Sequence, residues 1–380
     1  MASAHRTLVL SFPSLPAFLA SSAHLAPVRS SARATRTRLL VLVRTPAHAP
    51  SPWLGPAPAP ETGTASSADP APPPLPPPTA LFLPLERALA RTYAAATSAF
   101  FESDDGPLKS VDVVVEQLRL VGGVCVNETE HGDVDRWEWD GDDNDDVLTS
   151  ASGKGKGRAD DPAPALEPAV SGDEAAAVPS IYPVVALGGT FDHLHAGHKI
   201  LLTMACAICS DKLIVGVSDE VLLQNKKYKH LLEPLDARIR AVEQFVALVR
   251  PSIRCDAVPL QDVYGPTAHD PSVGALVVSD ETRSGGDTIN TLRREKSLSQ
   301  LDIYTISLVA DDARLPSSSS SAALPPSDPA AAAGGVAAEV PVSAKMGSTG
   351  IREWLDRRRS RLGGPSGRGS STDGETRGAV

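Results

Sequence analysis

The pattern of hydrophobic and polar residues is regular in the C-terminal half of the chain and weaker in the residues before it. From Tyr182 onward, short apolar runs alternate with segments whose apolar residues have helical spacing. The runs predict strands, and the spaced segments predict helices. The predicted strands lie at 183–188, 213–217, 254–260, 275–279 and 303–309, and the predicted helices at 198–210, 234–249 and 289–301. This alternation is typical of an α/β fold with a doubly wound, Rossmann-like parallel sheet.

The remaining segments predict a divided chain. Residues 80–126 have apolar periodicity that predicts a small helix-and-strand module, whereas residues 45–79 are rich in Pro and Ala and predict an extended linker. We therefore expect four parts: a largely disordered or divergent N-terminal region (1–127), a disordered acidic and Pro/Ala-rich linker (128–180), an α/β domain (181–362) containing a disordered insertion (311–343), and a disordered tail (363–380).

Composition narrows the classes of function. The 380 residues include 34 Pro and 29 Gly and only 4% aromatic residues, so much of the chain is poorly suited to a packed core. The formal net charge of −10 argues against nonspecific nucleic-acid binding, which depends on neutralising phosphates. A transmembrane helix is not expected, because the sequence contains no apolar stretch of 18 residues or more.

The N-terminus allows two interpretations. Residues 1–60 contain no Asp or Glu and carry arginines among Ser and Ala, which is typical of a mitochondrial transit peptide. Alternatively, Arg6–Leu19 and Arg38–Val43 are strand-like and helix-like pieces of an N-terminal domain. The four cysteines are scattered and fit a reducing compartment, so we expect a cytoplasmic protein, with mitochondria as the alternative.

Chemistry is concentrated where the first C-terminal strand ends. Gly188 and Gly189 allow the backbone to approach a ligand closely, and Thr190 adds a hydroxyl and an amide. His195 and His198 are three residues apart at the start of a helix, so both can face one bound group. The free amides of that helix start favour phosphate. A metal centre is less favoured because the segment offers no convincing third ligand.

Two segments carry a family resemblance. Thr190-Phe191-Asp192 followed by His195-Ala196-Gly197-His198 is similar to the T/H-x-G-H signature of the nucleotidyltransferase superfamily. The turn Ser348–Arg352 resembles its second signature, ISSTxxR. Within that superfamily, the chain resembles the eukaryotic phosphopantetheine adenylyltransferases and the corresponding domain of CoA synthase. The resemblance covers most of residues 182–310 and resumes at 344–355.

The resemblance implies a reaction. The family has a HUP-type fold and transfers AMP from ATP to 4′-phosphopantetheine, which gives dephospho-CoA and pyrophosphate in coenzyme A biosynthesis. It also implies Mg²⁺ bound with ATP through phosphate and water, and association with other enzymes of coenzyme A biosynthesis. The residues themselves indicate phosphate binding but do not identify pantetheine.

Site roles can be carried over by position. The resemblance implies catalytic roles for His198, Lys226 and Arg352, in which Lys226 binds the incoming phosphate and Arg352 clamps the leaving pyrophosphate. The implied substrate and nucleotide contacts are Gly188, Gly189, Thr190, Phe191, His195, Ser279, Glu281, Arg283, Ser348 and Thr349. Two positions depart from the pattern. Gly347 replaces the first serine of the second signature, and Ser279 stands where bacterial members have an arginine, for which Arg283 is a candidate substitute.

Two rival functions stay open at this point. A cytidylyltransferase acting on an alcohol phosphate shares the first signature, but its second signature normally differs from residues 345–352. A catalytically inactive scaffold of the same fold is the other rival. Intact Thr190, His198 and Arg352 argue against it.

Overall fold

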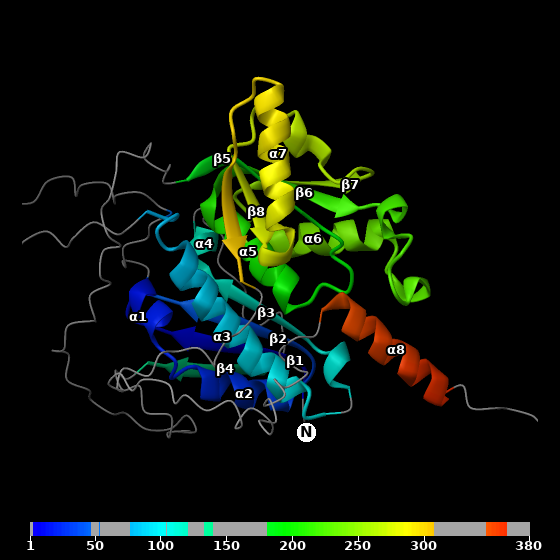
Figure 1. Ribbon diagram of the computed structural model, residues 1–380. Coiled ribbons are helices and arrows are strands. Elements are labelled where there is room, and N and C mark those ends of the chain that lie inside the picture. The colour runs from blue at the N-terminus through cyan, green and yellow to red at the C-terminus, as the bar shows by residue number, and fades with distance from the viewer. Residues whose placement is uncertain are drawn as a thin grey trace, which may run out of the picture.

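Two parallel sheets flanked by helices make up the part of the chain that the structure describes. The computed structural model describes residues 3–46, 53, 77–103, 105–120, 133–139, 181–307 and 347–362. The C-terminal sheet and the helices between its strands (green to yellow in Figure 1) lie above the N-terminal sheet (blue to cyan). The architecture confirms the α/β, Rossmann-like fold. The expected insertion at 311–343, the tail at 363–380 and most of the linker at 45–79 lie outside the described residues.

The C-terminal sheet has the strand order β7-β6-β5-β8-β9, and all its pairings are parallel. Its strands are β5 (Tyr182–Gly189), β6 (Cys209–Ser218), β7 (Arg254–Leu260), β8 (Ala275–Ser279) and β9 (Asp302–Ile306), and its helices are α5 (Ala196–Ile208), α6 (Leu235–Val249), α7 (Arg283–Glu295) and α8 (Ser348–Leu362). All five predicted strands are present. β5 and β6 are central because their apolar runs are buried on both faces.

Helix α7 differs from its prediction. It begins at Arg283 instead of Ile289 and ends at Glu295 instead of Leu301. A one-turn helix at Asp280–Thr282, capped by Ser279, leads directly into it. The pair Gly285-Gly286 therefore lies inside the helix, where a β-carbon on Gly286 would come within 3.1 Å of the Ile303 side chain. Close packing of the helix on β9 explains a glycine that sequence reasoning would assign to a turn.

The N-terminal sheet has the order β3-β2-β1-β4 and is also parallel. Its strands are β1 (Ser3–Ser11), β2 (Thr35–Arg44), β3 (Ser110–Val115) and β4 (Asp133–Glu138), and its helices are α1 (Leu15–Ala20), α2 (Leu25–Ala34), α3 (Phe82–Phe100) and α4 (Glu116–Leu120). In both sheets the first strand lies between the second and the fourth. The described part of residues 1–127 is thus folded, and β4 corrects the expectation that 128–180 is entirely linker.

Charge pairing explains the acid-free N-terminus. Arg6 donates to Asp135 over 2.7 Å, and Arg44 donates to Glu116 over 2.8 Å. Arginines of β1 and β2 therefore find their carboxylates in β4 and α4, later segments of the chain. The residues that resembled a transit peptide include the two central strands of this sheet, as the alternative interpretation expected.

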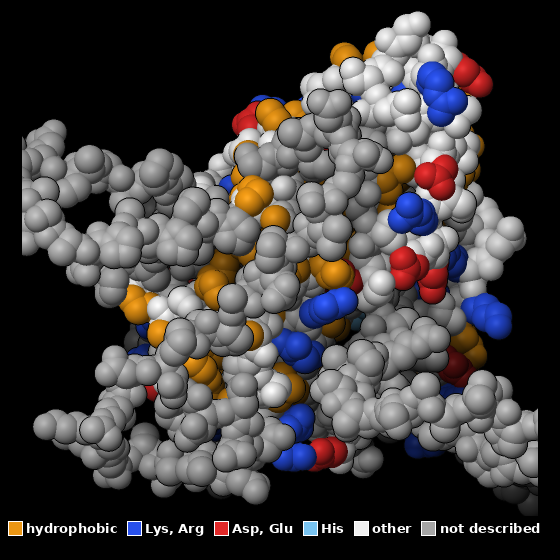
Figure 2. Space-filling view, turned by 60° about the vertical axis from the view of Figure 1, so that its left-hand side comes forward, with side chains coloured by type: hydrophobic (Ala, Val, Ile, Leu, Met, Phe, Trp, Pro, Cys, Tyr) orange, Lys and Arg blue, Asp and Glu red, His pale blue; other side chains and the backbone are white. Residues whose placement is uncertain are grey.

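The two units share one hydrophobic core. Helix α3 packs against α5, and buried side chains of both units form a continuous cluster. The Glu86 carboxylate in α3 also accepts a hydrogen bond from the Ser307 backbone N–H over 2.6 Å. Charged side chains of both signs lie near one another on the face in Figure 2. Among the described helices, none has the length and apolar character needed to cross a membrane.

Candidate active site

A cleft of about 1460 Å³ lies at the carboxyl ends of the C-terminal strands. Gly188 and Gly189 line it from the end of β5, Ser218 from the end of β6 and Ser279 from the end of β8. Open parallel sheets bind ligands at this edge. The position therefore matches the one expected for a phosphate site.

The loop after β5 turns sharply. Phe191 and His193 have φ angles of 51° and 46°, which are uncommon for residues with side chains. The Phe191 ring is fully buried, and a β-carbon on Gly189 would lie 3.2 Å from it. Phe191 is not among the residues that line the cleft; its ring centroid lies 5.2 Å from that of His198. The Phe191 ring therefore packs beside the start of α5 without lining the cleft.

His195 and His198 line the cleft together. Their rings stack with centroids 3.9 Å apart. Burial, reinforced by the positive charge of Lys199, lowers the pKa of His195 to about 4. Burial, reinforced by His195 and Lys199, holds the pKa of His198 well below its usual range. Both rings are therefore neutral at pH 7, and each carries one N–H. The Nδ1 atom of His198 is buried with no hydrogen-bond partner among the described residues.

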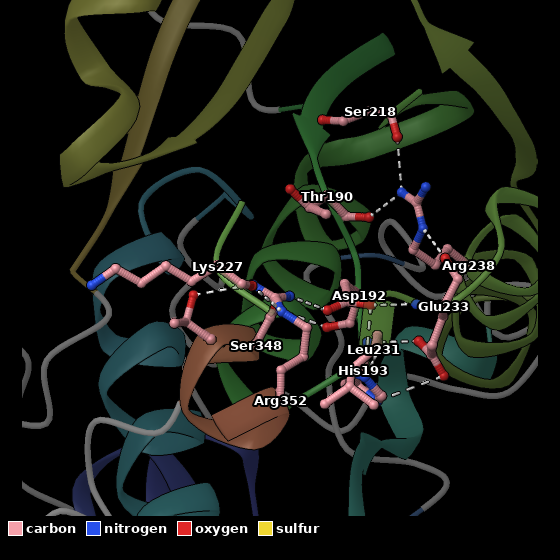
Figure 3. Close-up of polar contacts among 11 residues, drawn as sticks. Thr190, Asp192, His193, Ser218, Lys227, Leu231, Glu233, Arg238, Ser348 and Arg352 are labelled. Atoms are coloured by element: carbon pink, nitrogen blue, oxygen red, sulfur yellow. Dashed lines mark hydrogen bonds and ion pairs between the residues drawn. The ribbon is translucent and has the colours of Figure 1, made fainter. Parts of the chain in front are cut away.

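His193 is engaged in holding the loop. Its backbone N–H donates to the Glu233 carboxylate over 2.6 Å, and its Nε2 lies 2.9 Å from the Leu231 carbonyl oxygen. Figure 3 shows both contacts. They connect the first signature to the segment before α6.

A buried ion pair joins the two signatures. The Arg352 guanidinium pairs with the Asp192 carboxylate, and their side chains are 1% and 0% exposed (Figure 3). Arg352 also donates from Nε to the Lys227 carbonyl over 3.1 Å. The second Asp192 oxygen accepts from the Glu233 backbone N–H over 2.9 Å. The guanidinium is thus held by partners inside the protein, and Arg352 also belongs to the lining of the cleft. The pyrophosphate contact that the resemblance implies stays a prediction.

The hydroxyls of the second signature are also engaged. Ser348 donates to the Asp192 carbonyl over 2.8 Å, and the Thr349 hydroxyl accepts from Arg352 over 3.2 Å. Both residues line the cleft. A β-carbon on Gly347 would lie 4.0 Å from Nε2 of His195. Two segments distant in sequence therefore meet directly at the histidine pair.

The other expected contacts divide into two groups. Lys226 is exposed and lines the cleft, as do Ser279 and Glu281. Arg283 is outside the lining, and its guanidinium donates to the Thr305 hydroxyl over 3.1 Å. Arg283, the candidate substitute for the arginine of bacterial members, therefore points toward β9.

Sequence reasoning missed Arg238. This side chain is 1% exposed and donates from Nη1 to the Thr190 carbonyl over 2.8 Å and to the Ser218 carbonyl over 2.9 Å (Figure 3). It therefore ties together the ends of β5 and β6. A signal was present, because Arg238 follows Leu235 by three residues and precedes Val242 by four, on the apolar face of α6.

Acidic ligands are sparse around the cleft. Glu281 is the one carboxylate among the described residues that line it. Across the same described residues, no group of three or more His, Cys, Asp or Glu side chains is arranged to hold a metal ion. Cys206 and Cys209 are buried free thiols, in line with a core role.

Comparisons with known proteins agree with this geometry. A cytidylyltransferase-like family model matches residues 186–323. The chain is 50% identical over 128 residues to the phosphopantetheine adenylyltransferase of Saccharomyces cerevisiae, which covers 34% of this chain and 42% of that protein. It is 41% identical over 135 residues to the phosphopantetheine adenylyltransferase of Methanopyrus kandleri, covering 35% of this chain and 85% of that protein.

The fold and the paired signatures define a nucleotidyltransferase of the cytidylyltransferase-like class. Within that class, the chain belongs to the phosphopantetheine adenylyltransferase family. The match spans less than half of the yeast relative's length.

Proposed function

We propose that the chain is an enzyme that transfers AMP from ATP to 4′-phosphopantetheine and releases pyrophosphate, with dephospho-CoA as the product. The observation that carries this proposal is the meeting of both signatures at one cleft, where His195 and His198 lie beside Gly347–Thr349. Family membership supports the choice of substrates.

The chemistry requires positioning more than proton transfer. A phosphate monoester has a second pKa near 6, so the acceptor is largely dianionic at neutral pH and needs no general base. One of its oxygens attacks the α-phosphorus of ATP, and the bond from that phosphorus to the pyrophosphate oxygen breaks. Neutral His198, with His195, donates to phosphoryl oxygens as charge develops, and Lys226 holds the acceptor phosphate.

The metal enters as part of the nucleotide. Mg²⁺ commonly keeps several waters and binds through substrate phosphates with one or two carboxylates. A cleft with Glu281 as its described carboxylate fits that mode. We therefore propose MgATP as the substrate form, in which the ion neutralises triphosphate charge.

A cytoplasmic location is proposed alongside the activity. Several arginines of residues 1–60 have carboxylate partners within the fold: Arg6 pairs with Asp135, Arg38 with Asp112 and Arg44 with Glu116. Their abundance therefore has an explanation within the fold. Imaging of the full chain carrying a C-terminal fluorescent tag tests the location, and mitochondrial signal would contradict it.

A two-by-two assay tests the activity. Pyrophosphate release is measured with ATP or CTP, each with phosphopantetheine or phosphocholine. We expect release with ATP and phosphopantetheine. Preference for CTP and phosphocholine would instead identify a cytidylyltransferase, and absence of release from every pair would identify an inactive scaffold.

A further inference from the structure

The N-terminal unit contributes to the wall of the cleft. Thr97 and Phe100 of α3 line it, and so do residues 109–111 at the start of β3. The family match begins at residue 186, so this wall comes from outside the matched region. The cleft is therefore built by two folded units.

A buried lysine of α5 holds the start of β3 against that helix. Lys199 follows His198 in α5, and its ammonium group lies 2.7 Å from an Asp112 carboxylate oxygen. The same group donates to the Val111 carbonyl over 2.7 Å and to the Ser110 hydroxyl over 2.8 Å. The Lys199 and Asp112 side chains are each 5% exposed, so this contact is sealed from water.

This anchor determines where Lys109 lies. Lys109 immediately precedes Ser110, is half-buried and lines the cleft. Its ammonium group lies 5.6 Å from the centroid of the Phe100 ring. No carboxylate among the described residues forms an ion pair with it.

The charges of the cleft single out Lys109 and Lys226. The Lys and Arg residues among its described lining are Lys109, Lys199, Lys226 and Arg352. Lys199 is ion-paired with Asp112, and Arg352 is ion-paired with Asp192. Two lysines without ion-pair partners in the described chain therefore face a reaction between two anions, a triphosphate and a phosphate monoester.

We propose that Lys109 binds a phosphate group of one of these substrates, so that the active site is shared between the N-terminal and C-terminal units. This proposal rests on the proposed function for the identity of the substrates. A lysine ammonium is a compact point charge with three donors and suits phosphate oxygens. Lys226 accounts for one anion, and Lys109 supplies the second cation from the opposite unit.

Lys109→Ala tests the proposal in the full chain. The KM values for MgATP and for phosphopantetheine are measured separately, together with the binding of each by calorimetry. We expect one of the two affinities to fall about tenfold or more, as for a lost charge-assisted hydrogen bond, with kcat changed much less. Which affinity falls identifies the source of the phosphate. Lys109→Arg should restore most of it.

Lys212→Ala is the matched control. Lys212 lies near the amino end of β6, away from the cleft, and its removal changes the net charge equally. It should leave both affinities unchanged. Unchanged affinities for both substrates in Lys109→Ala would overturn the proposal, and Lys109→Gln serves in the same titrations if the alanine variant melts early.

The enzymatic activity of the wild type and phosphate binding at Lys109 are tested separately. Wild-type protein that releases no pyrophosphate from ATP would contradict the proposed function. Titration of wild type and Lys109→Ala with inorganic pyrophosphate then tests the lysine alone. Weaker binding to the variant would support a phosphate site at Lys109, and equal binding would overturn it.

Discussion

Two stacked neutral histidines, His195 and His198, face the cleft. Burial keeps His195 and His198 uncharged at pH 7, so they meet phosphate oxygens as dipoles. A neutral N–H strengthens its contact as negative charge grows on the transferring group. Lys226 adds full charge where the cleft opens to solvent.

Removing His198 should damage turnover without unfolding the protein. We expect His198→Ala to lower kcat on the order of a hundredfold or more, as for loss of one donor to a developing oxyanion. Steady-state pyrophosphate release measures the effect, and thermal melting checks the fold. His5→Ala is the control, since His5 is an exposed residue of β1. Full activity in His198→Ala would remove this residue from the mechanism.

The pH dependence of kcat/KM should come from titration of the acceptor's phosphate group. Because the pKa of His195 is lowered to about 4 and that of His198 also lies well below its usual range, neither ring titrates between pH 6 and 8. We expect kcat/KM to fall below about pH 6, where the acceptor phosphate gains its second proton. The pH at which kcat/KM falls should be the same in His195→Asn as in the wild type. A shift of this pH in the variant would show that the histidine is the titrating group.

Single residues were predicted from sequence where a signature named them, and the structure places Thr190, His198 and Lys226 around one cleft. The ion-pair partner of Arg352 was not predictable, because Asp192 is 160 residues away in sequence. Arg238 was missed because its position on the apolar face of α6 indicates burial but does not identify the two strand-end carbonyls that it binds.

Between elements, the ion pair of Asp192 and Arg352 connects the loop after β5 to α8. The Ser348 hydroxyl and the Lys227 carbonyl extend this connection. The helix that carries the second signature is therefore held to the first by buried polar contacts. Low exposure makes those contacts strong when complete and costly when one partner is lost.

Asp192→Asn should weaken both stability and catalysis. The substitution leaves the Arg352 charge buried without its counter-ion, which costs about 3–5 kcal/mol. Chemical denaturation measures the loss, and we expect kcat to fall as the second signature shifts. Asp356→Asn is the control, because Asp356 pairs with His230 on the exposed side of α8. Equal stability of the two variants would contradict the role of the buried pair.

At the level of elements, short runs rich in apolar residues were sufficient to predict the five C-terminal strands, including β7 and β9, which are mostly half-buried or exposed. β4 was missed because it is a short edge strand whose residues are mostly exposed or half-buried, so it lacks an apolar run. The start of α7 was missed because its first turns contain Gly285 and Gly286. The parallel N-terminal sheet was not predicted, since its strands pair across the long intervening segments.

For the whole molecule, the contact of Lys199 with Asp112 is the main buried charge pair between the two units. Burial tends to raise the pKa of Asp112, but the positive charges of Lys199 and Arg38 outweigh it and lower that pKa. A carboxylate with a depressed folded pKa stabilises the fold above its unfolded value of about 3.9. That stabilisation is lost as the pH falls through the folded pKa.

Asp112→Asn should therefore destabilise the protein at pH 7 by about 3–5 kcal/mol and flatten the decline of stability below pH 4. Unfolding free energies measured between pH 3 and 7 (roughly the range around the unfolded pKa) test this. Asp112→Asn combined with Lys199→Met should recover much of the loss at pH 7. Asp236→Asn, which removes an exposed pair with Arg240, should change little. If the unfolding free energy of Asp112→Asn fell below pH 4 as steeply as that of the wild type, the role of Asp112 in acid stability would be contradicted.

The fate of the acceptor's phosphate oxygens shows whether the protein transfers AMP from ATP to phosphopantetheine. Phosphopantetheine labelled with ¹⁸O on its phosphate is incubated with MgATP and the full chain, and the products are weighed by mass spectrometry. We expect dephospho-CoA that keeps all of the label, and unlabelled pyrophosphate, because an acceptor oxygen attacks the α-phosphorus. Label in the pyrophosphate, or no adenylylated product, would contradict AMP transfer in this cleft.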